Sequence, residues 1–507
     1  MDNKNFDDLK KFLDQSGLRI GFNPQAKPEQ EEDGPDEGEL RRNKALQFDF
    51  RPSQIKEYLD RYVIQQEDAK KVLSTAVCDH YHNAQSKLRS DKDDRDYKKQ
   101  NILLIGPTGV GKTYLVQNIA RLIGVPFVKA DATKFSETGY VGGDVEDLVR
   151  ELVHQAQGDI RLAEYGIVYL DEIDKIAGAS NIAGRDVSGH GVQRGMLKLM
   201  EETEVPLRSP TDIAGQMQAL MEFQTKGKME KKTISTKNIL FIVSGAFGGL
   251  LEIIKKRIGG KRIGFREGEP LDEHEIFGMA RSVDFIEYGF EAEFIGRLPV
   301  IAHCNQLETE DLFKILKYSE GSLLKQYKRD FLSYGIDVFF TDEGMKAMAE
   351  AAVKEQTGAR GLMTVGEKTF REYKYVLPDH SEVNEFVVEA DLVEDPKEKL
   401  RELLENPSLY RDRINGFQTV KFAKLFEEKF GIPVQMTREA VKHLKEKASR
   451  AEVDASDHLI MLFGEYEHGL NLLRNAESKE RYEITPAVID QPSQSLDAWI
   501  RRSYKRE

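Results

Sequence analysis

The chain has 507 residues, 40% of them hydrophobic and 32% charged, and a formal net charge of −13 at pH 7. This length exceeds what one hydrophobic core usually serves, so we expect two to four domains. The acidic balance argues against non-specific nucleic-acid binding, and the absence of any run of about 18 apolar residues argues against a membrane span.

Features of the amino terminus and the cysteine content favour a cytoplasmic protein. The start MDNKNFDDLKKFLDQ lacks the basic residues and apolar centre of a secretory signal. Only Cys78 and Cys304 are present, too few for a disulfide framework or a cysteine-based zinc site. Within residues 1–50, the stretch QAKPEQEEDGPDEGE has the composition of a flexible acidic tether.

Residues 51–308 are predicted to form an α/β domain. Apolar residues at helical spacing begin near Ile55, and later strand-like runs alternate with helical patterns; these runs are NILLIG, VPFVKAD, GIVYLDEID, NILFIVSGA and PVIAHCN. The alternation predicts a parallel sheet with helices on both faces. A polar stretch between Thr203 and Thr236 is interpreted as a surface insertion.

Residues 309–398 and 399–507 show what looks like an internal repeat. At a constant offset of 96, FLSYGIDVFFTDEGMKAM faces EEKFGIPVQMTREAVKHL, and FVVEADLVEDPKEKL faces YEITPAVIDQPSQSL. The shared offset suggests a small α+β domain followed by a second copy of it. The alternative is two unrelated helical segments with similar turn chemistry.

The strongest chemical motif is GPTGVGKT, which runs from Gly106 to Thr113 between an apolar strand and a helix. Such a loop lets backbone N–H groups wrap phosphates at a helix amino terminus, while Lys112 neutralises β- and γ-oxygens and Thr113 can bind Mg²⁺. The residues predicted to bind ATP here are Pro107, Thr108, Gly109, Val110, Gly111, Lys112, Thr113 and Tyr114.

The run GIVYLDEID places two carboxylates at the end of a buried strand. We expect Asp171 to hold the Mg²⁺, directly or through water, and Glu172 to polarise the attacking water. Alone, such a pair is more often a solvated cap or turn. In a chain that also has a phosphate-binding loop, the pair favours ATP hydrolysis. An enzyme that transfers phosphate to a small metabolite is a further alternative.

Eight ordered segments between about residues 52 and 396 together resemble the ClpX family of AAA+ unfoldases. They are DRYVIQQEDAKKVL, GPTGVGKT, ETGYVGGDVEDLV, GIVYLDEIDKI, GRDVSGHGVQRGMLKLME, FIVSGAFGGL, EAEFIGRLPVIA and QTGARGLMTV. The resemblance implies an AAA+ P-loop NTPase domain followed by a small lid, assembled as a homo-hexamer with ATP between subunits.

The resemblance also implies roles for individual residues. Tyr140 and Val141 match the pore loop that grips a translocating polypeptide, although a buried turn is the alternative for Tyr140, and Arg185 matches a second pore loop. Arg297 matches the arginine finger that reaches a neighbour's γ-phosphate. The remaining matches are Arg360, the sensor that couples the lid to the nucleotide, and Val63 and Ile64, which sandwich the adenine.

The sequence departs from the family in three places. The four cysteines of the amino-terminal zinc-binding domain have no counterpart, Gln65 stands where the family usually has Gly, and the basic entrance loop is replaced by the 203–236 insertion. Ile263, Gly264 and Phe265 match the loop that docks on the ClpP peptidase, although the same tripeptide recurs at residues 20–22.

The function expected from these features is an ATP- and Mg²⁺-dependent unfoldase that threads protein substrates through a hexameric pore for a ClpP-like peptidase. The alternative is a stand-alone remodelling ATPase or assembly scaffold without a peptidase partner. Neither a nucleic acid nor a membrane is an expected partner.

Overall fold

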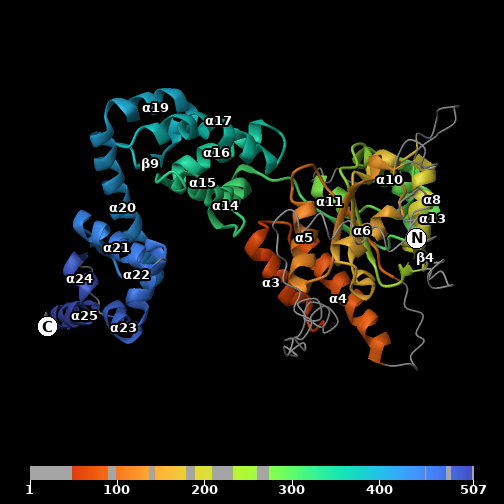
Figure 1. Cartoon of the computed structure of the whole chain (residues 1–507), viewed down its shortest axis with the longest axis horizontal. Coiled ribbons are helices and arrows are strands. Elements are labelled where there is room, and N and C mark those ends of the chain that lie inside the picture. The colour runs from red at the N-terminus through yellow and green to blue at the C-terminus, as the bar shows by residue number, and fades with distance from the viewer. Residues whose placement is uncertain are drawn as a thin grey trace, which may run out of the picture.

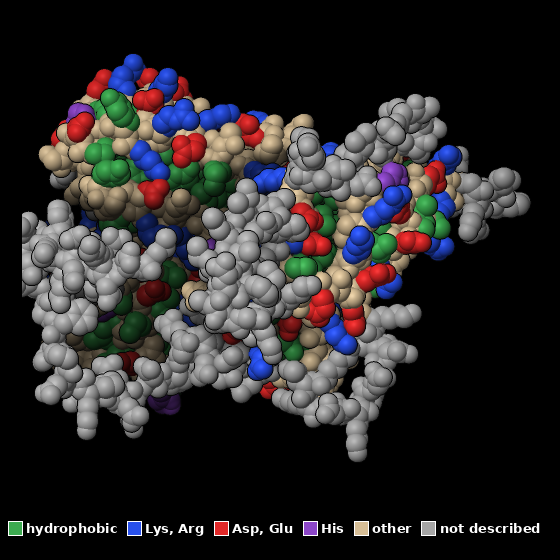
Figure 2. All heavy atoms as spheres, turned by 45° about the vertical axis from the view of Figure 1, so that its right-hand side comes forward, with side chains coloured by type: hydrophobic (Ala, Val, Ile, Leu, Met, Phe, Trp, Pro, Cys, Tyr) green, Lys and Arg blue, Asp and Glu red, His purple; other side chains and the backbone are tan. Residues whose placement is uncertain are grey.

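The computed structural model describes residues 48–89, 99–135, 143–178, 189–207, 232–259, 273–451, 453–475 and 481–504 (Figure 1). In the described part of the chain, no helix has the length and apolar character needed to cross a membrane. On the face shown in Figure 2, Lys and Arg side chains are interspersed with Asp and Glu, as on a mixed-charge surface that faces solvent.

A five-stranded parallel sheet organises the first half of the molecule. Its strands follow the order β2-β3-β6-β1-β7, and every neighbouring pair is parallel. The strands are β1 (Ile102–Ile105), β2 (Phe127–Asp131), β3 (Ile167–Asp171), β6 (Leu240–Gly245) and β7 (Val300–His303). The predicted parallel α/β sheet is therefore confirmed, and its nearly continuous apolar strands are the reason it could be predicted.

Helices connect and cover these strands. Among them, α4 packs against β1 and β7, and α6 packs against β2 and β3. The helices are α3 (Pro52–Tyr62), α4 (Glu67–Arg89), α5 (Lys112–Ile123), α6 (Asp147–Gln155), α7 (Ile160–Ala163), α8 (Gly189–Met200), α10 (Leu250–Gly259), α11 (Glu273–Gly278), α12 (Ser282–Tyr288) and α13 (Ala292–Gly296), with short 3₁₀ turns η1 (Ala132–Lys134) and η2 (Ile173–Ile176).

A short antiparallel pair flanks the predicted insertion. Strands β4 (Glu204–Pro206) and β5 (Thr233–Ser235) pair with Val205 opposite Ile234. Residues 208–231 lie outside the described residues.

The part of the chain after β7, residues 309–405, is mostly helical, and we call it the lid. Its two short strands, β8 (Asp337–Phe340) and β9 (Glu385–Val388), pair in parallel. Its helices are α14 (Thr309–Tyr318), α15 (Leu323–Leu332), α16 (Asp342–Lys354), α17 (Arg360–Val376), α18 (Ala390–Glu394) and α19 (Pro396–Glu405), with the turn η3 (Leu377–Asp379).

From the lid, the long helix α20 (Pro407–Phe430) leads to a last unit that has its own hydrophobic core (Figure 1). This unit contains two parallel strands, β10 (Val434–Met436) and β11 (Tyr482–Ile484). Its remaining helices are α21 (Arg438–Arg450), α22 (Ala455–Gly464), α23 (Glu467–Asn475), α24 (Pro486–Asp490) and α25 (Pro492–Tyr504).

Several elements of the lid recur in the last unit at the offset of 96. Helix α21 covers the positions equivalent to α16, and α24 those equivalent to α18. The strand register also recurs, because Val338 opposes Phe386 in the lid and Val434 opposes Tyr482 in the last unit. The last unit therefore has the lid's fold over these elements.

Candidate functional site

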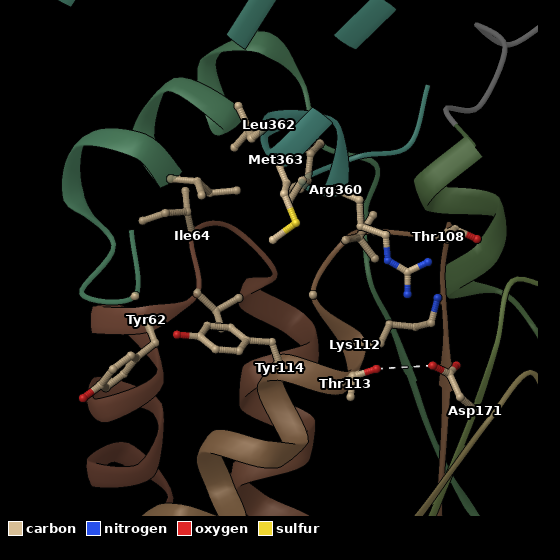
Figure 3. Close-up of a pocket in the computed structure, with 18 of the residues that line it drawn as sticks. Tyr62, Ile64, Thr108, Lys112, Thr113, Tyr114, Asp171, Arg360, Leu362 and Met363 are labelled. Atoms are coloured by element: carbon tan, nitrogen blue, oxygen red, sulfur yellow. Dashed lines mark hydrogen bonds between the residues drawn. The ribbon is translucent and has the colours of Figure 1, made fainter. Parts of the chain in front are cut away.

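A pocket of about 500 Å³ lies between the phosphate-binding loop, the end of β3 and the lid (Figure 3). This volume is within the range of ligand-binding pockets. Twelve residues that the sequence predicted for ATP binding and hydrolysis line it: Val63, Ile64, Thr108, Gly109, Val110, Gly111, Lys112, Thr113, Tyr114, Asp171, Glu172 and Arg360.

The loop between β1 and α5 has backbone conformations that require glycine. Gly106, Gly109 and Gly111 have φ angles of 152°, 78° and 96°, a region that L-residues with side chains rarely adopt. Gly111 is also the N-cap of α5, so the unpaired N–H groups of the first helical turn face the pocket. A helix amino terminus of this kind attracts phosphate.

Lys112 is held inside the same loop. Its Nζ donates hydrogen bonds to the carbonyl oxygens of Gly106, at 2.5 Å, and Pro107, at 2.8 Å. Burial lowers the pKa of Lys112 below its ordinary 10.5, and nearby Asp171 partly offsets this effect. An anionic ligand would favour the charged ammonium, so the site is suited to phosphate oxygens.

Asp171 is fixed by two hydroxyl groups at the end of β3. Ser244 Oγ donates to its Oδ1 at 2.6 Å, and Thr113 Oγ1 donates to its Oδ2 at 3.2 Å (Figure 3). Ser244 is itself within 2.6 Å of the Tyr169 hydroxyl. A hydroxyl and a carboxylate beside a phosphate site supply the oxygen ligands that Mg²⁺ prefers, so the residues present fit this cation.

Glu172 has a strained backbone. Its φ angle is 57° at the N-cap of η2, in the left-handed region. Such conformations cost of order 1–3 kcal/mol for residues other than glycine and concentrate at functional sites. Its backbone N–H donates to Asp171 Oδ1 at 3.1 Å, which ties the two acids together.

The lid forms the opposite wall of the pocket. Arg360, the first residue of α17, extends toward Lys112, whereas Leu362 and Met363 lie near Ile64 and form an apolar end (Figure 3). Sequence reasoning missed these two residues, although both directly follow Arg360 in the GARGLM segment. It also missed other lining residues, namely Tyr62, Asp174, Lys175, Gly245, Ala246, Leu307, Ile315, Ser319, Gly321, Leu323, Gln326 and Ala359.

Two predicted residues do not line this pocket. Pro107 lines a neighbouring cavity of about 810 Å³ instead, although its carbonyl contacts Lys112. Arg297 lies at the C-cap of α13, with its side chain 48% exposed and paired with Glu201 at 2.5 Å. The side chain of Arg297 therefore does not line the pocket of its own chain.

The six predicted pore-loop and docking residues cannot be placed. Tyr140, Val141, Arg185, Ile263, Gly264 and Phe265 lie outside the described residues.

The departure at Gln65 leaves the turn before α4 in place. Gln65 and Gln66 have φ angles of 60° and 62°. The side chain of Gln66, which is 1% exposed, accepts from the Asn305 N–H at 2.6 Å and donates to the Asn305 carbonyl at 2.9 Å. Gln66 thus attaches the turn to the segment after β7, a role that the sequence analysis missed.

Comparison with known proteins finds a family model and relatives that are similar to this chain. A model of the AAA domain (Cdc48 subfamily) matches residues 97–301. The chain is also similar to two proteins named "ATP-dependent Clp protease ATP-binding subunit ClpX", from Borrelia duttonii (strain Ly) and Borrelia recurrentis (strain A1). Each is 41% identical over 350 residues, which is 68% of this chain and 78% of the relative.

Proposed function

The chain belongs to the ClpX family and is an AAA ATPase, and from this we propose that it uses ATP hydrolysis to unfold proteins and thread them through the pore of a homo-hexamer. The main support is that two parts of the chain form the pocket. Lys112 and Asp171 come from the α/β domain, and Arg360 comes from the lid. Release of the γ-phosphate would change the contacts of both parts and so change their relative position.

Binding of ATP relies on complementary charge and shape. The N-terminal turn of α5 and Lys112 receive the phosphates, and Arg360 adds a second cation from the lid. The apolar end near Ile64, Leu362 and Met363 suits the flat adenine ring. Thr113 and Asp171 would hold Mg²⁺, which, when bound, neutralises charge on the phosphate oxygens.

Hydrolysis assigns separate roles to a general base of one subunit and an arginine cation of its neighbour. Glu172 acts as the general base for water, and its neighbour Asp171 stays fixed by Ser244 and Thr113. Arg297 reaches the pocket of the adjacent subunit and stabilises charge on the γ-phosphate as the bond to it breaks. Its exposure and its absence from its own pocket support this assignment.

A direct backbone contact couples the pocket to the lid. The N–H of Ala359, one residue before α17, donates to the Gly109 carbonyl of the phosphate-binding loop at 2.9 Å. The loop therefore cannot shift without affecting the lid. We assign Tyr140, Val141 and Arg185 to the surfaces that carry this movement to the substrate.

The partner that receives the substrate is proposed from the relatives. Their name makes them the ATP-binding subunit of a Clp protease, and Ile263, Gly264 and Phe265 are our candidates for contact with a ClpP-like peptidase. The second candidate function is remodelling or scaffolding without a peptidase. It is favoured by the last unit, which has its own core and carries Ser456 at the position equivalent to Arg360.

The decisive variant is Tyr140→Ala. The wild type should unfold a fluorescent protein that is fused to an unstructured peptide, and so abolish its fluorescence, only when ATP is present. Tyr140→Ala should hydrolyse ATP at a similar rate without extinguishing the fluorescence, since it keeps the pocket and loses the aromatic grip. Electron micrographs with ATP should show closed rings of six. Equal unfolding by the variant, or an ATP-bound monomer, would contradict the proposal.

A further inference from the structure

Gln193 is a fully buried polar side chain that the mechanism above does not use. It lies in α8 and has 0% exposure. Its Nε2 donates to the Ile176 carbonyl at 2.8 Å, and its Oε1 accepts from the Glu291 N–H at 2.9 Å. Both ends of the amide are therefore satisfied by backbone groups that are far apart in sequence.

Each of these backbone groups belongs to a short element that also carries a residue proposed to act in hydrolysis. Ile176 is the last residue of η2, the turn that starts immediately after the strained Glu172. Glu291 is the N-cap of α13, and Arg297 is the C-cap of the same helix. Since α13 has only five residues and rises about 1.5 Å per residue, displacement at Glu291 is passed to Arg297 with little loss.

We propose that Gln193 is a positioning residue that couples the acidic turn of one subunit to the arginine that the same subunit offers to its neighbour. Through Gln193, the state of Glu172 in one pocket would influence the placement of Arg297 in the next pocket. The inference rests on the proposed role of Arg297 between subunits.

The chemistry of the site explains why an amide stands there. A carbonyl and an N–H on opposite sides require one group that donates and accepts at once, and the glutamine amide does both. Met offers neither hydrogen bond, and Glu at neutral pH can only accept. Leaving both backbone groups unpaired in a buried site would favour movement of η2 and α13 apart.

Helix α8 is joined to α13 by further contacts. His190 Nδ1 lies 3.2 Å and Arg194 Nε 3.4 Å from Glu291 Oε1, and at the far end Glu201 pairs with Arg297. Gly189 packs so closely on the Ile176 carbonyl that an added Cβ would lie 2.6 Å from it. The helix is thus fastened to η2 at its start and to α13 at both ends.

A double-mutant cycle on the full-length protein tests the coupling. We expect Gln193→Met to lower kcat for ATP roughly 10-fold or more, because misplacement of a reacting group by about an ångström has effects of this size. The KM for ATP should change little, because Gln193 does not line the pocket. In an Arg297→Ala background, Gln193→Met should cause a much smaller fold-loss of kcat, because the part that acts through Arg297 is already absent.

A matched control distinguishes the effect of coupling on kcat from the effect of removing any buried glutamine amide. Gln418 is 1% exposed in α20 and bonds to Glu385 of the lid, so Gln418→Met should leave kcat unchanged. If Gln193→Met cannot be purified, Gln193→Glu gives the same cycle, since it retains only the acceptor. An equal fold-loss of kcat with and without Arg297 would overturn the inference alone. Normal hydrolysis by Arg297→Ala would instead contradict the proposed function.

Discussion

Gly358 offers the sharpest test of the connection between lid and nucleotide. It precedes α17, has a φ angle of 59° and faces the phosphate-binding loop. A Cβ at Gly358 would lie 2.8 Å from the Gly109 carbonyl oxygen and 3.0 Å from that of Thr108, whereas ordinary contacts begin at 3.4 Å. Gly358→Ala should therefore push the lid and the loop apart by several tenths of an ångström.

The magnitude follows from four contributions, three that destabilise the variant and one that stabilises it. The left-handed conformation destabilises a folded protein with alanine at this position by about 1–2 kcal/mol. Alanine also lowers the conformational entropy of the unfolded chain, which stabilises the folded state by about 0.4–1 kcal/mol. The overlap with the loop adds about 1–3 kcal/mol. Loss of the hydrogen bond between Ala359 and Gly109 adds about 1 kcal/mol. If half of the overlap, about 0.5–1.5 kcal/mol, is relieved by moving the loop, the Kd for ATP should rise about 2- to 13-fold.

Gly335 supplies the control. It is also a lid glycine in the left-handed region, with a φ angle of 75°, but no atom lies within 4 Å of an added Cβ. Gly335→Ala should therefore share the backbone strain and lower the thermal midpoint by a few degrees, while ATP binds with unchanged affinity. Titration with a fluorescent ATP analogue and thermal melts measure both effects. Equal ATP affinity in the two variants would refute the reasoning.

Three further outcomes are expected. Glu172→Gln should bind ATP normally but hydrolyse it at least about 100-fold more slowly, as measured by single-turnover release of phosphate, and fast turnover would remove Glu172 as the base. Phe265→Ala should lose capture of a ClpP-like peptidase in a pull-down while keeping its ATPase rate, whereas equal capture would favour the scaffold function. Because the pKa of Lys112 is lowered and phosphates favour its charged form, ATP affinity should fall as the pH rises through a value below 10.5. An ATP affinity that stays constant up to pH 10.5 would contradict this expectation.

Much of the sheet could be predicted because its information is local. Strands β1, β3 and β6 are short, mostly apolar runs, and β1 and β3 lead into the loop and the acids that identify them. The far wall of the pocket could not be predicted in this way. Leu362 and Met363 carry no motif of their own, and their position depends on the lid folding back over a loop about 250 residues earlier in the chain. The strained turn at Glu172 likewise depends on packing, since no local pattern favours a left-handed glutamate.

In the repeat, the local sequence pattern predicts the helix caps correctly but does not predict the length of every helix. Thr341 and Thr437 both cap their helices, at 2.9 Å from the Gly344 N–H and 3.1 Å from the Ala440 N–H. The single helix α17 nevertheless becomes two helices, α22 and α23. Gly464, at the position equivalent to Lys368, is the last residue of α22, so the first of the two helices ends at a glycine.

The second copy of the lid keeps the threonine cap but has a different residue at the position of Arg360. A threonine cap satisfies N–H groups that the fold itself exposes, so any copy that folds needs it. Arg360 lines the pocket, and its equivalent is Ser456, whose N–H donates to Asp454 Oδ1 at 2.7 Å. The copy is held to the lid by Lys445, which lies 3.3 Å from Glu385 and over the ring of Phe339. The copy therefore keeps the lid's capped helix and strand register and differs at the position that lines the pocket.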